Sequence, residues 1–331
     1  MRYLITGGAG FIGSHIADAL VTRGDSVLIL DDLSTGRLGN IEHLLESESV
    51  DFIEGSVLDE GLVDDCMHAV DGCFHLASAV GVQLVVSRPL SSLRRNIRGN
   101  DIVISCAARR GTPLVFASTS EIYGKNSTGA LTEDSDRLLG AISKLRWSYA
   151  NAKAFGEALV YSYVKEQSCP MSVVRLFNTV GPRQTGAYGM VLPRFVRQAL
   201  DGSDLTVYGD GRQSRCFGHV FDVVDGILRV ADEPRTAGRP FNIGSPVQTT
   251  VMALAERVIE RTGSSSDIVL VPYEQAYDEG FEELGRRQPD TTALEELTGW
   301  RATRTVDEAI DDVIAYSRGA ETVQESLRLV G

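Results

Sequence analysis

Two residues four positions apart, Tyr149 and Lys153, have the types and spacing needed to move a proton. On a helix this spacing places both side chains on one face. Because a nearby ammonium group stabilises a phenolate, we expect Lys153 to lower the pKa of Tyr149 toward neutrality. The phenolate then accepts a proton from a substrate hydroxyl while a cofactor accepts hydride from the same carbon. Exposed helices also carry such pairs without function, so this prediction depends on the motifs around it.

Hydroxyl and carboxylate side chains follow an apolar run upstream of this pair, in the segment Ser118-Thr119-Ser120-Glu121. The apolar run is typical of a β-strand that ends where these side chains begin. Open α/β sheets bind their ligands at the carboxyl ends of the strands. We therefore expect this segment to face Tyr149 and a bound substrate.

A glycine-rich turn lies near the start of the chain, where Gly7, Gly10 and Gly13 follow an apolar run and precede a helical pattern. In this arrangement Gly7 permits the tight turn, Gly10 lets the backbone approach a pyrophosphate, and Gly13 permits close packing of helix and sheet. Asp31 stands at the end of the next apolar run. An acidic residue there accepts hydrogen bonds from a ribose and repels a 2′-phosphate, which favours NAD over NADP.

Strand and helix patterns alternate through the first half of the chain. The expected strands cover residues 2–6, 26–30, 50–53, 72–76, 114–117 and 173–177, and the expected helices 11–23, 90–109 and 150–165. This alternation predicts an α/β fold of the Rossmann type with a doubly wound parallel sheet. Further helices are expected at 191–200, 220–231, 250–261 and 306–316. We expect residues 1–177 to form a cofactor-binding domain to which later segments return, and residues 178–331 a smaller C-terminal α/β part that binds substrate.

Composition excludes several classes of partner. The 331 residues include 32 Lys and Arg against 45 Asp and Glu, a net charge of −13. An acidic surface repels nucleic acids and anionic membranes. The sequence shows no apolar run long enough to span a bilayer and no signal-peptide pattern. Its five cysteines are widely spaced and form no metal-binding motif, so we expect reduced cysteines, no metal and a cytoplasmic location.

Taken together, these motifs resemble the extended short-chain dehydrogenases/reductases that act as nucleotide-sugar epimerases, dehydratases and decarboxylases. The similarity runs from Arg2 to Tyr316. Beyond the motifs above, it rests on His75-Leu76-Ala77, Asn178 with Gly181-Pro182-Arg183, Leu205-Thr206-Val207-Tyr208-Gly209, Arg215, Phe241-Asn242-Ile243-Gly244, and Arg287 with Asp290. The resemblance implies NAD as cofactor, a UDP-sugar as substrate, and a homodimer whose four-helix bundle uses the helices expected at 90–109 and 150–165.

The resemblance also implies roles for individual residues. Thr119 would bond the reacting sugar oxygen, Tyr149 would be the base, and Lys153 would activate it. Glu121 would complete the catalytic set. The implied cofactor-binding residues are Gly7, Gly10, Phe11, Ile12, Gly13, Asp31, Asp32, Ser34, Thr35, Gly36, Ser56, Val57, Leu76, Ala77, Ser78, Asn96, Ser118, Tyr149 and Lys153.

A second implied set would hold the sugar nucleotide. Its members are Val80, Thr119, Ser120, Asn178, Leu192, Thr206, Tyr208, Arg215, Arg287 and Asp290. By the resemblance, Thr206 and Tyr208 would cradle the uracil. Arg215 and Arg287 would clamp the diphosphate, for which arginine is the suitable planar donor. Asp290 would contact the nucleotide ribose.

The resemblance leaves the reaction open, because members of this group begin alike by oxidising the sugar C4 hydroxyl. We expect a 4-epimerase that acts on a UDP-hexose, of the UDP-glucose/UDP-galactose or the UDP-glucuronate type, through a transient 4-keto intermediate. The alternative is a UDP-glucuronate decarboxylase, or a dehydratase, that shares the first step. A carboxylate at Glu121 is useful for chemistry at C5 and C6, or else it braces its loop. Thr185 offers no charge to a uronate carboxylate. Arg183, Arg194 or Arg212 would have to supply the positive charge that a uronate carboxylate needs.

Two other classes of function fit the sequence less well. A non-catalytic regulator that binds NAD would need no proton-transfer residues such as Thr119, Tyr149 and Lys153. A simple dehydrogenase would have no use for the predicted arginine clamp.

Overall fold

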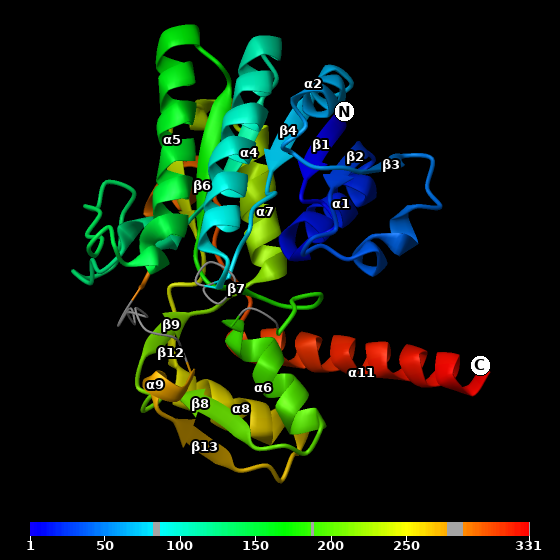
Figure 1. Ribbon diagram of the computed structural model, residues 1–331, viewed down its shortest axis with the longest axis vertical. Helices are drawn as coiled ribbons and strands as arrows, with labels where there is room; N and C mark the ends of the chain where they lie inside the picture. Colours follow the sequence, from blue (N-terminus) through cyan, green and yellow to red (C-terminus); the bar gives the residue numbers. More distant parts are fainter. Residues whose placement is uncertain (82–86, 187–188, 277–286, 331) are drawn as a thin grey trace.

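The structure, a computed structural model, describes residues 1–81, 87–186, 189–276 and 287–330. Its larger part is a seven-stranded parallel sheet with helices on both faces, and a smaller part lies below it in Figure 1. The strands run in the order β11-β6-β5-β4-β1-β2-β3. Their bounds are β1 Arg2–Thr6, β2 Ser26–Asp31, β3 Val50–Glu54, β4 Gly72–His75, β5 Leu114–Thr119, β6 Met171–Leu176 and β11 Pro240–Ile243. The predicted α/β fold with a Rossmann-type parallel sheet is confirmed.

The order of the strands reverses beside β1, which pairs with β2 on one side and with β4 on the other. The register places Thr6, the last residue of β1, next to Leu30 and His75. Open α/β sheets bind ligands at such a point, outside the carboxyl ends of the strands. The glycine turn that follows Thr6 therefore lies in the crevice between the two halves of the sheet.

Helices cover both faces of the sheet (Figure 1). Each face shares an apolar core with its own helices. One face packs against α1 (Phe11–Arg23) and α7 (Val220–Asp232). The other packs against α2 (Glu60–His68), α4 (Pro89–Arg110) and α5 (Ser148–Gln167). Burial of both faces explains why the strands read as apolar runs without alternation.

Local signals set the ends of the long helix α4. Pro89 occupies its first turn, where a missing N–H costs nothing, and Arg109 and Arg110 lie in its last turn, where cations are favoured. Gly111 follows with a φ of 67°, the left-handed conformation that closes many helices. These signals are local, so the sequence predicted the helix over 90–109 with nearly the observed bounds.

The strand at the far edge of the sheet, β11, was not predicted. It comes from the second half of the chain and pairs with β6, where Asn242 lies beside Arg175. A segment after residue 177 thus joins the sheet of the larger part. The division of the chain at residue 177 itself stays a prediction.

The smaller part packs its helices around a third apolar core. Those helices are α6 Val191–Leu200, α8 Val251–Thr262 and α11 Val306–Val330. Short strands pair in twos: β8 Leu205–Tyr208 with β13 Ile268–Val271, β9 Ser214–Cys216 with β12 Gln248–Thr250, and β7 Thr179–Val180 with β10 Gly218–His219. Two further helices in the second half of the chain are short, α9 Tyr273–Ala276 and α10 Thr292–Thr298. The described chain as a whole also contains the 3-10 turns η1 Leu38–Asn40, η2 Glu42–Leu44, η3 Ser120–Tyr123, η4 Leu145–Trp147 and η6 Pro234–Thr236. Over the described ranges, no helix has both the length and the apolar character needed to cross a bilayer.

A buried polar network ties β5, α5 and β6 together behind the crevice. Arg175 on β6 and Glu157 on α5 form an ion pair with a closest N···O distance of 2.7 Å. The Ser118 hydroxyl at the end of β5 donates to the same carboxylate at 2.5 Å. A buried ion pair is tolerated when further hydrogen bonds satisfy its atoms, as they do here. Because Glu157 lies one turn after Lys153, the network fixes the face of α5 that carries Lys153.

Candidate active site

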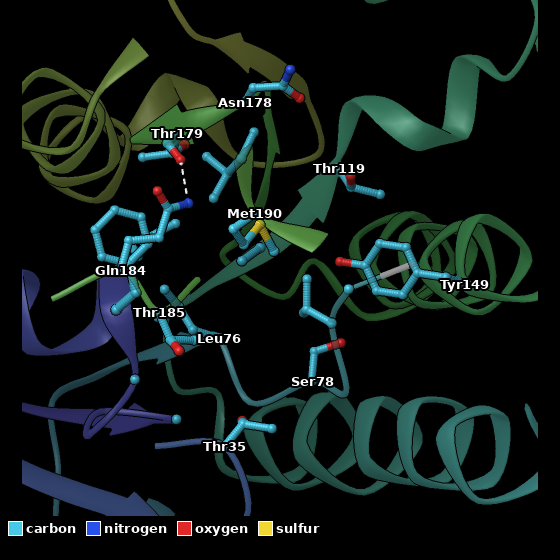
Figure 2. Close-up of a pocket in the computed structure, with 18 of the residues that line it drawn as sticks. Thr35, Leu76, Ser78, Thr119, Tyr149, Asn178, Thr179, Gln184, Thr185 and Met190 are labelled. Carbon is cyan, nitrogen blue, oxygen red and sulfur yellow. Dashed lines mark hydrogen bonds between the residues drawn. The ribbon is translucent and has the colours of Figure 1, made fainter. Parts of the chain in front are cut away.

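A cavity of about 520 Å³ lies at the carboxyl ends of the sheet and extends to residues of the smaller part (Figure 2). It brings together most of the residues that the sequence predicted for the site. Those lining it are Gly7, Gly10, Phe11, Ile12, Gly13, Asp31, Asp32, Ser34, Thr35, Val57, Leu76, Ala77, Ser78, Val80, Ser118, Thr119, Ser120, Glu121, Tyr149, Lys153, Asn178, Tyr208, Arg215 and Arg287.

The other predicted residues do not line the cavity. They are Gly36, Ser56, Asn96, Leu192, Thr206 and Asp290. The buried Asn96 amide accepts a hydrogen bond from the Ala79 N–H at 2.7 Å and so holds the loop after β4. Leu192 is fully buried in the apolar core of the smaller part. The Thr206 hydroxyl accepts from the Gln198 side chain at 3.0 Å. In this structure these three side chains make contacts elsewhere than in the cavity.

Two more of the predicted residues that do not line the cavity accept hydrogen bonds from backbone N–H groups of their own loops. The Ser56 hydroxyl accepts from the Leu58 N–H at 3.3 Å, and the Asp290 carboxylate accepts from the Thr292 N–H at 2.9 Å. Both are short-range turn contacts of the kind that serine and aspartate commonly make.

The glycine turn forms a close cradle between β1 and β4. Gly7 has a φ of +74°, and a Cβ there would lie 2.7 Å from the backbone nitrogen of Ala77. A Cβ on Gly10 would lie 3.0 Å from the Gly7 carbonyl oxygen. The helix α1 begins after Gly10 without a side-chain cap. Its first N–H groups are therefore suited to bind an anion, and the cradle fits the pyrophosphate of a dinucleotide.

Asp31 lies in the same cavity at the end of β2. Its carboxylate accepts hydrogen bonds from the N–H groups of Ala9 at 3.0 Å and Leu33 at 2.9 Å. Burial raises the pKa of Asp31, and these two hydrogen bonds oppose the shift. Its position fits an acceptor for ribose hydroxyls, beside which a 2′-phosphate would be repelled.

We expect Asp31→Ala to weaken NAD binding by about 10- to 100-fold, because a charge-assisted hydrogen bond to the ribose contributes about 1.5–3 kcal/mol. Calorimetric titration of the purified protein with NAD measures this change. The matched control is Asp51→Ala, which removes an exposed carboxylate that pairs with Arg2 at 2.7 Å outside the cavity. An unchanged dissociation constant in Asp31→Ala would remove this residue from the cofactor site.

Lys153 lines the cavity and is almost fully buried. Its Nζ donates to the Ala117 carbonyl at 2.7 Å and lies 4.9 Å from the centre of the Phe116 ring. Burial lowers the pKa of Lys153 to about 7, although the negative charge of Glu157 acts to raise it. The group therefore changes its charge near neutral pH.

Tyr149 points its hydroxyl into the cavity between Thr119 and Ser78 (Figure 2). Burial raises the pKa of Tyr149, and the negative charge of Glu121 adds to the shift. Hydrogen bonding with Ser78 and Thr119 opposes it. The prediction that Lys153 brings this pKa toward neutrality is wrong for the protein by itself, because burial dominates.

Glu121 follows β5 on the turn η3 and is held by two arginines. One carboxylate oxygen lies 2.7 Å from Arg287 Nη1, and the other lies 2.9 Å from Arg146 Nη1. Burial disfavours the charged carboxylate, but the two guanidinium charges outweigh burial and lower the pKa of Glu121 to about 2. Glu121 is therefore ionised at neutral pH, and a guanidinium group holds it on each side.

Arg287 lies at the reacting end of the cavity as well as near Arg215. Its Nη1 donates to Glu121, and it lies 3.3 Å from the Ser120 hydroxyl. Burial lowers the pKa of Arg287 despite the charge of Glu121, and the charge of Arg215 adds to the lowering. The two arginines of the predicted clamp are thus close enough to interact. The contact with Glu121 was not predicted for Arg287.

The sequence did not identify Arg146 as a site residue. It offered Arg194 only as one of three arginines that could pair with a uronate carboxylate. Arg146 lines the cavity on η4, and the only signal for it is a charged residue one turn before Tyr149. The Arg194 guanidinium lies 4.0 Å from the centre of the Tyr208 ring, and it donates to the Thr206 carbonyl at 3.0 Å. Arg194 therefore lies with the residues predicted to hold the base.

The chain matches known proteins over almost its whole length. Residues 3–244 match the model of the NAD dependent epimerase/dehydratase family. The chain is 40% identical to a UDP-N-acetyl-alpha-D-glucosaminuronate decarboxylase of Bacillus cytotoxicus, over 97% of this chain and 98% of that protein. It is 33% identical to UDP-glucuronic acid decarboxylase 1 of Xenopus tropicalis, over 96% of this chain and 72% of that protein.

The fold also matches solved structures of the same family. The structure of UDP-glucose 4-epimerase from Thermotoga maritima with UDP-glucose superimposes with a TM-score of 0.87. It is 28% identical and covers 97% of this chain and 99% of that one. These matches confirm the resemblance and NAD as the cofactor, for which the glycine cradle and Asp31 are suited. The chain belongs to the NAD dependent epimerase/dehydratase family.

Proposed function

We propose that this NAD-dependent enzyme decarboxylates a UDP-linked uronic acid, either UDP-glucuronate or its 2-acetamido counterpart. The observation that carries the proposal is the buried contact between Glu121 and Arg287 beside Thr119 and Tyr149. A uronic acid has a carboxylate at C6, next to the carbons that react, whereas a hexose has a neutral hydroxymethyl group. Guanidinium is the planar donor best suited to a carboxylate. The two relatives named as decarboxylases support the same assignment.

Arg287 has a donor to spare for such a substrate. Its Nε is buried and has no hydrogen-bond partner among the residues that the structure describes. A buried donor without a partner costs about 1–3 kcal/mol. An anionic oxygen of the substrate placed there would recover that energy, which favours binding.

The remaining residues of the cavity supply proton transfer. The glycine cradle and Asp31 would hold NAD, which would supply reversible hydride acceptance for C4 of the sugar. Tyr149 as phenolate accepts the proton of the C4 hydroxyl, and the Thr119 hydroxyl bonds the same oxygen. Lys153 lies behind them, on the next turn of α5.

A ketone at C4 makes the C6 carboxylate part of a β-keto acid. The C5–C6 bond breaks, carbon dioxide leaves, and the bonding pair enters an enolate that spans C4 and C5. A proton from solvent then adds to C5, and Tyr149 returns its proton to the C4 oxygen when the hydride returns. The products are one UDP-pentose and one carbon dioxide. Because Glu121 is ionised, its part is to orient the guanidinium groups near C6.

This proposal replaces the 4-epimerase that the sequence analysis expected. The relatives with the higher identities among those compared are decarboxylases, whereas the epimerase of known structure shares 28%. The absence of charge at Thr185 does not argue against a uronate, because Arg287 lies at the reacting end. A 4-epimerase shares the first oxidation step and stays the second candidate.

The test is to incubate the purified protein and NAD with UDP-glucuronate, UDP-N-acetylglucosaminuronate, UDP-glucose and UDP-galactose in separate reactions. We expect one carbon dioxide for each UDP-uronate consumed and a UDP-pentose identified by mass and NMR. Tyr149→Phe is the inactive control. Interconversion of UDP-glucose and UDP-galactose without release of carbon dioxide would support the epimerase. Conversion of none of the four substrates would contradict both.

We also propose that the protein is a homodimer formed through α4 and α5. Leu90 on α4 and Phe155 on α5 are 60% and 39% exposed, which leaves apolar surface on these two helices. Covering such surface in a four-helix bundle is favourable. Light scattering coupled to size-exclusion chromatography measures the mass, and a monomer at micromolar concentration would contradict the proposal.

A further inference from the structure

The side chain of Arg95 joins the two halves of the sheet across the crevice. Arg95 lies on α4 and lines the cavity. Its Nη1 donates to the Ser34 hydroxyl at 2.5 Å and lies 3.2 Å from the Asp32 carboxylate. Both partners belong to the loop after β2. Because β1 lies between β4 and β2 in the sheet, a contact from α4, which comes after β4, to this loop crosses the carboxyl end of β1.

The loop after β2 is folded closely around two carboxylates. Asp31 accepts a hydrogen bond from the Leu33 N–H at 2.9 Å, and Asp32 accepts one from the Ser34 hydroxyl at 2.5 Å. Leu33 has a φ of 52°, in the left-handed region that residues other than glycine seldom adopt. Such a conformation persists only where the surrounding contacts impose it. Arg95 ties this arrangement to the other half of the sheet.

Arg95 also offsets negative charge at the place where an anionic cofactor would bind. Asp31 and Asp32 both line this part of the cavity, and a dinucleotide brings the charges of its pyrophosphate. Burial raises the pKa of Asp31, and the charge of Asp32 adds to the increase. A guanidinium group beside Asp32 reduces the repulsion among these anions.

We propose that Arg95 is a positioning residue for the cofactor, which holds the loop after β2 against the adenosine part of NAD and slows its release. The side chains of Arg95 and Asp32 are 38% and 30% exposed, and ion pairs this exposed contribute little to stability. The contact can therefore open without unfolding of its surroundings, as release of a cofactor requires. This role is the same for decarboxylation and epimerisation, because both reactions begin with NAD.

The experiment measures the release of NADH, which is fluorescent, from the purified protein when an excess of NAD displaces it. We expect Arg95→Met to release NADH about 3- to 10-fold faster than the wild type, while the association rate changes by no more than about twofold. Arg95→Lys keeps the positive charge but lacks the planar guanidinium, so its release rate should be intermediate. An unchanged release rate in Arg95→Met would overturn the inference.

A double-mutant cycle tests whether Arg95 acts through the loop. Asp32→Asn removes the carboxylate charge with which Arg95 pairs. When Asp32→Asn is already present, Arg95→Met should speed the release of NADH by less than about twofold. Effects that multiply in the double variant would show that Arg95 acts independently of the loop, contrary to the proposal.

The matched control is Arg98→Met, which alters an exposed arginine about one turn later on α4 that is not among the described residues lining the cavity. It should leave both rates unchanged. Thermal unfolding shows whether each variant is folded, and UDP, which has no adenosine, should bind Arg95→Met as it binds the wild type. An equal loss of UDP and NADH binding would reveal a general structural role and overturn the inference. No sugar substrate enters these measurements, so a failure of the proposed decarboxylation would leave their outcome intact.

Discussion

Tyr149→Phe should lower kcat by roughly 10²- to 10⁴-fold, which is the usual contribution of a positioned general acid–base group. The substitution removes only the phenolic oxygen, the group that exchanges a proton with the C4 hydroxyl. The ring remains in place, so NAD and the sugar nucleotide should still bind. Release of carbon dioxide from UDP-glucuronate under saturating substrate measures the effect.

A second tyrosine on α5 provides the control for this variant. The Tyr163 hydroxyl lies 3.1 Å from the Ser105 hydroxyl of α4 and does not line the cavity. Tyr163→Phe should therefore release carbon dioxide from UDP-glucuronate with the kcat of the wild type. If Tyr149→Phe kept near-normal turnover, Tyr149 would have no part in proton transfer.

The Tyr149 phenol also predicts a pH dependence. Since burial and the charge of Glu121 raise its pKa, little phenolate is present at neutral pH in the protein alone. Turnover of the wild type should rise as the pH increases and the phenol ionises. The residual turnover of Tyr149→Phe should lack this rise.

Glu121→Gln should lower kcat on UDP-glucuronate by about 100-fold, because both guanidinium groups lose the anion that orients them. The glutamine keeps the size of the side chain, so the turn η3 retains its packing. Removal of the negative charge also lowers the pKa of Tyr149, to which that charge contributes. The rising limb of the pH profile should therefore move to lower pH.

The ion pairs of Glu121 also predict how stability depends on pH. The pKa of this carboxyl in the folded protein is about 2, below its ordinary value of 4.5. The stabilising contribution is thus complete above pH 4.5 and is lost as the pH falls toward 2. Urea unfolding of wild type and Glu121→Gln should show a difference at pH 7 that shrinks on acidification.

The matched control for Glu121→Gln is Glu60→Gln, which alters an exposed carboxylate 3.1 Å from Arg109 on the outer face of α4. This variant should keep both the turnover and the pH profile of the wild type. Unchanged turnover in Glu121→Gln would show that the carboxylate only braces its loop.

Local features of this protein were open to prediction from the sequence. The glycine turn, the apolar strand before it and Asp31 after the next strand define the cofactor end, because each is set by a few consecutive residues. The spacing of Tyr149 and Lys153 placed both on one helix, which the structure confirms as α5. The helix expected at 90–109 agrees closely with α4, whose ends lie at the local signals Pro89 and Gly111.

Long-range features were decided only by the tertiary structure. Glu121 and Arg287 are 166 positions apart in the chain, and their contact depends on how the smaller part meets the sheet. The addition of β11 to the far edge of the sheet is likewise a long-range pairing. The spacing of residues along the sequence does not indicate which distant residues come into contact. Charge and burial at the site therefore had to be read from the fold, and they reversed the expected pKa of Tyr149.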